Sequence, residues 1–190
     1  MRCSANVKHA YAEPGAFTIV VSGASRTVLR AVMRVSAASP IAGTDAAPRT
    51  ATSVPADTSW QDQMLARIND LRSAVGAPPL ALCARLTRTA QDYATLMAST
   101  GHYGHVGPDG SEPWDRMSAH GYHWSKAAEN IAAGYDGVDS VMTGWRNSPG
   151  HYANIIDASL EHVGFGTATN TSSQYGTYWV QNFGQGGTCS

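Results

Sequence analysis

The order of hydrophobic patterns along the chain constrains its fold more than any other feature. From about residue 57, apolar residues recur at helical spacing, first from Met64 to Val75 and then from Leu82 to Met97. The end of the chain differs, because VGFGTAT and TYWVQNFG are rich in β-formers and flank the polar loop NTSSQYG. This is the pattern of a β-hairpin. Helices first and antiparallel strands last predict the α+β class.

Three shorter elements are expected between these helices and the hairpin. They are a short helix with Pro113 in its first turn, a strand-like segment AENIAAGY (128–135), and a helix through Trp145 that Pro149 and Gly150 interrupt.

Composition divides the chain into three parts. Residues 57–190 have the pattern of one compact domain, and residues 36–56 form a linker rich in Ala, Ser, Thr and Pro. Residues 1–35 are strand-like, with FTIVV and TVLRAVMRV separated by turn residues. We interpret this first part as either a fragment of a β-domain or a poorly ordered leader.

Charge and hydropathy exclude several classes of partner. The 190 residues carry a net charge of −1 without a basic block, which argues against nucleic acid as a partner. No segment approaches the ~20 apolar residues of a membrane span. A signal peptide is not evident either, because AFTIVVSGA is short and lacks a basic segment before it. If the protein is extracellular, its true N-terminus is expected upstream of Met1.

Three cysteines bear on the compartment. Cys189 lies one residue from the end, and a disulfide to Cys83 would tie down the last strand and leave Cys3 unpaired. Such a bridge would contribute about 4–5 kcal/mol in the chain-entropy model and imply an oxidising compartment. The alternative is two unrelated buried thiols.

Two histidines and one glutamate are the candidates for chemistry. His105 and His151 each lie beside Gly and Pro, and His151 begins a helix directly after Ser-Pro-Gly, a position that favours its neutral form. Glu129 is a lone carboxylate in the apolar stretch AENIAA and needs a partner if it is buried. Two His and one Glu are also a known catalytic zinc ligand set. Taken singly, each histidine is better explained as a surface residue or a satisfied core residue than as a ligand.

Several motifs in a fixed order resemble the CAP superfamily of cysteine-rich secretory, antigen 5 and pathogenesis-related proteins. The resemblance is closest to the bacterial SCP-domain branch and covers roughly Trp60 to Cys189. It implies an α-β-α sandwich around a central antiparallel sheet. The motifs are RINDLRSAVGAPPLAL, GHVGPDGSEPWDRMSAHGY, AENIAAGY, WRNSPGHYANII, HVGFGTAT and YWVQNFG.

The resemblance also implies a cleft that holds two His and two Glu. His105, Glu129 and His151 match three of these positions, whereas Ser148 replaces the second Glu. Asn154, on the same helix as His151, is counted with this cleft. The three matching residues would hold zinc if a metal is bound.

For function, the resemblance favours an extracellular binding module for a lipid, a small apolar molecule or a cell-surface component. The alternative is a metal-dependent hydrolase that uses the same cleft, with Glu129 as a ligand or general base. Ser148 weakens that alternative because it removes a carboxylate. Four aromatic residues are expected around the cleft, with ordinary packing as the alternative for at least half of them: Tyr103, Trp114, Tyr122 and Trp124.

A weaker likeness concerns the first part of the chain. VKHAYAEPGAFTIVVSG resembles the closing strands of a PKD-type β-sandwich, of which only the C-terminal part would be present. An arbitrary leader sequence is the alternative.

Overall fold

The fold is centred on one six-stranded sheet. A computed structural model describes residues 16–22, 28–34 and 59–190. The strands follow the order β1-β2-β4-β6-β5-β3, and all neighbours are antiparallel except β3 and β5. Their bounds are β1 Ala16–Ser22, β2 Val28–Arg34, β3 Ala81–Leu82, β4 Lys126–Ala133, β5 His162–Asn170 and β6 Gly176–Gln185.

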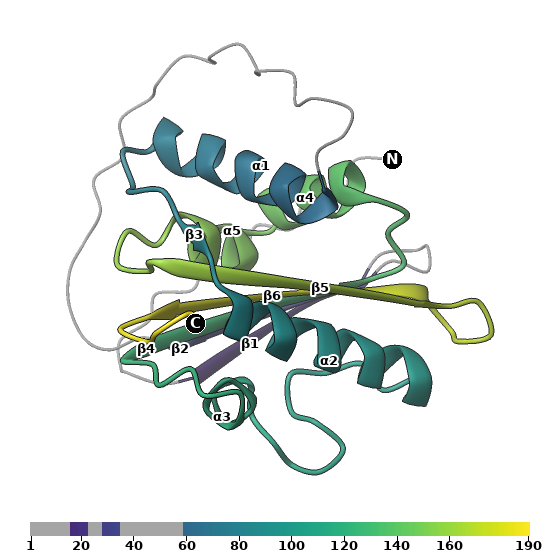
Figure 1. Ribbon diagram of the computed structural model, residues 1–190. Helices are drawn as coiled ribbons and strands as arrows, with labels where there is room; N and C mark the ends of the chain where they lie inside the picture. The colour runs from purple at the N-terminus through teal and green to yellow at the C-terminus, as the bar shows by residue number, and fades with distance from the viewer. Residues whose placement is uncertain (1–15, 23–27, 35–58) are drawn as a thin grey trace.

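Helices cover both faces of this sheet, as Figure 1 shows. Three of them, α1, α4 and α5, lie on one side, and α2 and α3 lie on the other. The expected α-β-α sandwich is therefore confirmed. The helix bounds are α1 Trp60–Ala74, α2 Ala84–Thr100, α3 Pro113–Ala119, α4 Val138–Arg146 and α5 Pro149–Ile156.

The helix ends follow local chemistry. The helix α1 begins after Ser59, whose hydroxyl accepts a hydrogen bond from the Asp62 N–H at 3.2 Å. At the C-terminal end of α2, Gly101 takes the left-handed conformation with φ of 71° and stops the helix, as its position in the sequence predicts. The interrupted helix is confirmed as α4 and α5, since Pro149 starts the second one.

The C-terminal hairpin is confirmed as β5 and β6, and α2 lies directly on it. A Cβ added at Gly164 would lie 2.1 Å from the backbone carbon of Leu86, and one at Gly166 would lie 2.2 Å from that of Ala90. Helix and strand backbones therefore touch, which only glycine allows. The short strand β3 was not predicted, because two residues carry no periodicity.

The first part of the chain contributes β1 and β2. They pair with each other, and β2 pairs with β4 in the register Val28↔Ala133 to Val32↔Glu129. The segments 1–15, 23–27 and 35–58, which include the linker and most of the PKD-like motif, lie outside the described residues. Whether residues 1–35 are a domain fragment stays a prediction.

A buried arginine that sequence patterns did not single out joins the end of α1 to the loop between α5 and β5. Arg72 is fully buried and donates to the carbonyls of Pro78, Ile155, Asp157 and Leu160 at 2.6–3.0 Å. Burial lowers the pKa of its guanidinium, and the nearby Asp157 offsets this in part. The charge is thus compensated by carbonyl oxygens, and Arg72 fixes the loop between α5 and β5.

The predicted disulfide is confirmed. Cys83, before α2, is bonded to Cys189, with 4.8 Å between their Cα atoms. Both cysteines pack with Leu86, Met117 and Tyr122. The bridge therefore fastens the C-terminal segment to the start of α2 across a separation of 106 residues.

Candidate functional site

Glu129 is the centre of a buried polar network on β4. Its side chain is fully buried, and its Oε1 accepts a hydrogen bond from His105 Nδ1 at 2.8 Å. Because a carboxylate only accepts, His105 carries its proton on Nδ1. Arg116 Nη2 lies 3.0 Å from the other oxygen, Oε2. The network thus joins an acid, an imidazole and a guanidinium.

A third donor to Glu129 comes from the neighbouring strand. Asn182 lies opposite Glu129 in the β4–β6 register. With its amide nitrogen turned toward the carboxylate, it donates to Oε2 at 3.0 Å, and its oxygen accepts from the Ala90 N–H at 3.3 Å. Both oxygens of Glu129 are therefore occupied by donors from the protein itself.

Arg116 connects this network to the loop before α3. It donates to the carbonyls of His105 at 2.9 Å and Ser111 at 2.7 Å, and its guanidinium carbon lies 3.5 Å from the centroid of the Tyr93 ring. Burial raises the pKa of the Tyr93 phenol, although the charge of Arg116 opposes this. Sequence reasoning missed Arg116. The sequence held one signal for this residue, because Arg116 is the single Lys or Arg between Arg88 and Lys126.

His151 belongs to a second network on the other side of β4. Its ring is buried, and its Nδ1 lies 2.7 Å from Ser148 Oγ. The Asn130 amide donates to the His151 carbonyl at 3.2 Å and to Gln181 at 3.0 Å, and it accepts from Asn154 at 2.9 Å. Of the predicted cleft residues, Ser148 thus contacts the His151 ring directly, and Asn154 joins the same network through Asn130.

The two networks meet at adjacent residues of one strand. Glu129 and Asn130 follow each other on β4, and successive side chains of a strand point to opposite faces of the sheet. His105 is consequently held on the face covered by α2 and α3, and His151 on the face covered by α5. A ligand that engaged both rings would have to lie beside β4 on the side away from β6, where β2 pairs with it.

The proposed zinc ligands fit a metal only in part. His105 Nε2 is buried and has no hydrogen-bond partner among the described residues, as a free ligand nitrogen would be. Glu129, however, is already bound by three donors. The described part of the chain contains no group of three or more His, Cys, Asp and Glu able to hold a metal ion. Zinc binding stays a prediction, and we derive no chemistry from it.

The aromatic residues expected around the cleft have other roles. Tyr122 is fully buried in the cluster around the disulfide, and Tyr103 packs against Tyr175 and Tyr178. Trp114 and Trp124 pack against each other with centroids 6.5 Å apart. Packing is therefore the better account of these residues.

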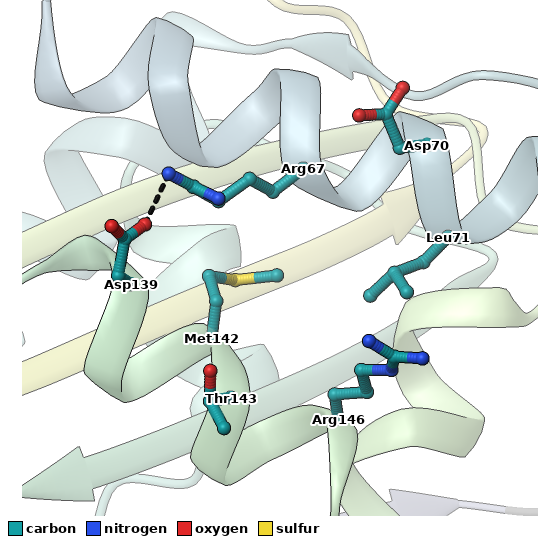
Figure 2. Close-up of a pocket in the computed structure, with 7 residues that line it drawn as sticks. All are labelled: Arg67, Asp70, Leu71, Asp139, Met142, Thr143 and Arg146. Atoms are coloured by element: carbon teal, nitrogen blue, oxygen red, sulfur yellow. Dashed lines mark ion pairs between the residues drawn. The ribbon is translucent and has the colours of Figure 1, made fainter. Parts of the chain in front are cut away.

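An open pocket lies elsewhere, between α1 and α4. Its volume is about 300 Å³. Leu71 and Met142 supply apolar surface, and Arg67 reaches across to form an ion pair with Asp139, as Figure 2 shows. The guanidinium of Arg146 stands next to Leu71. The full lining is Arg67, Asp70, Leu71, Asp139, Met142, Thr143 and Arg146.

None of the predicted site residues lines this pocket. A signal for it was nevertheless present, because Arg67 and Leu71 are four residues apart on α1, as are Met142 and Arg146 on α4. Each helix thus presents one arginine and one apolar side chain on the same face. Arg146 forms no ion pair within the described residues.

Solved structures and a curated relative resemble this chain over most of the domain. An uncharacterized protein of Bacillus subtilis strain 168, YkwD, is 29% identical over 161 residues, which are 84% of this chain and 61% of that protein. The chain therefore spans about three fifths of the relative's length. An extracellular SCP-domain protein of Bacillus anthracis is 26% identical, with a TM-score of 0.59 over 66% of this chain and 40% of that one.

A more distant structure supports the fold alone. An outer surface protein of Borrelia burgdorferi is 21% identical, with a TM-score of 0.58 over 66% of this chain and 91% of that one. Within the described residues, no helix has the length and apolar character needed to cross a membrane.

The profile of the cysteine-rich secretory protein family, CAP, matches residues 65–183. The chain therefore belongs to the CAP family.

Proposed function

We propose that the protein is an extracellular binding module whose ligand is an amphiphile with an anionic headgroup, such as a fatty acid, held in the pocket between α1 and α4. Two relatives support the location, since one is described as extracellular and another as an outer surface protein. The disulfide is in keeping with an oxidising compartment.

The observation that carries this proposal is the position of Arg146 in a pocket that is also lined by the half-buried Leu71 and the almost fully buried Met142. Arg67 is neutralised by Asp139, whereas Arg146 has no carboxylate partner within the described residues. An exposed guanidinium recognises a carboxylate or phosphate by paired hydrogen bonds. Leu71 and Met142 beside it would cover part of an acyl chain. At about 300 Å³, the pocket lies at the lower end of the range for small-molecule sites.

Reversing the charge of Arg146 is expected to weaken binding of palmitate at least tenfold. Arg146→Glu replaces the attraction by repulsion, which corresponds to about 1.4 kcal/mol or more. The measurement is displacement of a fluorescent fatty acid by palmitate. Arg88→Glu is the matched control, because Arg88 is an exposed arginine of α2 on the opposite side of the sheet. Equal palmitate affinity in both variants, or none in the wild type, would refute the proposal.

Metal binding at His105 is the second candidate, and with it the alternative of a metal-dependent hydrolase. It is favoured by the buried Nε2 of His105, which has no hydrogen-bond partner in the part of the chain that the structure describes. Native mass spectrometry with added Zn²⁺ is then expected to show one bound ion that is lost in His105→Ala. His123→Ala, at an exposed histidine, should retain the ion. A wild-type protein that takes up no zinc above a chelator control would exclude this candidate.

A further inference from the structure

Within the part of the chain that matches the family, β4 would be an edge strand without a partner on one side. Residues 65–183 contain β3, β4, β5 and most of β6, and in the order β4-β6-β5-β3 the strand β4 stands at one end. An end strand leaves one row of backbone N–H and C=O groups unpaired. From Ala127 to Ala133, β4 has no proline, and its single charged residue, Glu129, is turned inward. The strand therefore has no proline that would block a ladder of hydrogen bonds with another strand.

The hairpin formed by β1 and β2 fills this edge. Five residues of β2 pair with β4, and β1 pairs with the far side of β2. Figure 1 shows the purple strands continuing the sheet past β4. Both strands lie outside the residues that the family profile matches.

The hairpin is also placed at the candidate site. Val32 stands opposite Glu129, and Ala31 stands opposite Asn130, the two residues that hold the His105 and His151 networks. The strand β2 also contacts α5, which carries His151. The edge of β4 is the place from which both networks would be reached, and β2 occupies it.

We propose that β1 and β2 are a built-in strand ligand of this chain that closes the β4 edge and covers the approach to the His105 and His151 networks. A two-stranded hairpin is at best marginally stable alone, so FTIVV and VLRAV need a sheet to join. Covalent attachment gives the strand a high effective concentration at this edge.

Breaking β2 tests the proposal in the full-length chain. Ala31→Pro removes a ladder donor in the middle of β2, whereas Ala31→Thr keeps a good strand former there. The β4 amides that face β2 should exchange hydrogen at least tenfold faster in the proline variant, with the β5 and β6 amides unchanged. Diethyl pyrocarbonate should then modify His105 faster relative to the exposed His123. Unchanged exchange in β4 would overturn the proposal.

A cysteine pair provides a second measurement that does not depend on the proline variant folding. On a Cys3→Ser background, Val28→Cys with Ala133→Cys places two thiols at directly opposed positions, and an intramolecular disulfide is expected. Val28→Cys with Ala127→Cys is the control, because Ala127 is six residues, or roughly 20 Å, farther along the strand. Equal bridging in both pairs, or bridges between molecules alone, would overturn the assignment to the chain's own hairpin.

Discussion

Replacing Arg116 by methionine is expected to lower the free energy of unfolding by about 3–5 kcal/mol. The carboxylate of Glu129 has no exposed surface, and Arg116, itself 12% exposed, is the permanent cation beside it. Removing one partner of a buried ion pair leaves an uncompensated charge, which costs more than the pair contributes. Urea unfolding at pH 7 measures the change.

Two further variants separate this effect from loss of an arginine in general. Arg67→Met breaks the exposed ion pair with Asp139 and is expected to cost under about 1 kcal/mol. Adding Glu129→Gln to Arg116→Met removes the stranded charge and should recover part of the loss. If the double variant is as unstable as Arg116→Met, or less stable, the loss of stability comes mainly from the packing of Arg116 on Tyr93 and not from the unpaired charge of Glu129.

Loss of the disulfide is the second large effect. Cys189→Ser is expected to lower the free energy of unfolding by about 4–5 kcal/mol, because the unfolded chain regains the freedom of a loop with a separation of 106 residues. The serine hydroxyl also enters a cluster that contains Leu86 and Met117. Urea unfolding with and without a reductant measures this change.

The reductant and the third cysteine supply the controls. Reduced wild-type protein should approach the stability of Cys189→Ser, and reductant should leave that variant unchanged. Cys3→Ser has no role in the bridge and is expected to unfold like the wild type. If the reductant leaves the free energy of unfolding of the wild type unchanged, the contribution assigned to the disulfide is contradicted.

The sequence predicted those elements whose signals are local. The stripe from Leu82 to Met97 and the stop at Gly101 gave α2, and the β-formers around NTSSQYG gave β5 and β6. For α1, Asp57 and Thr58, with Gln61 three residues after Thr58, predict the helix cap, whereas Ser59 is the cap in the structure. Several short polar residues in a row offer equivalent caps, and the preceding chain decides among them.

The candidate site was predictable only in part. A lone Glu in AENIAA signalled a buried carboxylate in need of partners, and His105 is one of them. Arg116 and Asn182 were not foreseen, because they approach from α3 and β6, far away in the sequence. The structure also separates His105 from His151 by the plane of the sheet. The alternation of Glu129 and Asn130 implies this only once β4 is known to be a strand with helices on both faces.

The sequence by itself determined the α+β class, the order of helices and hairpin and the family likeness, since each depends on periodicity or on motifs within short segments. For the disulfide it left two unrelated thiols as the alternative, and the structure decided for the bridge. The tertiary structure alone decided which donors surround Glu129, that β2 completes the sheet beside it, and that α1 and α4 leave a pocket between them. These features arise where segments distant in the chain meet. Their geometry depends on which faces and edges are brought together, and short-range patterns do not encode that.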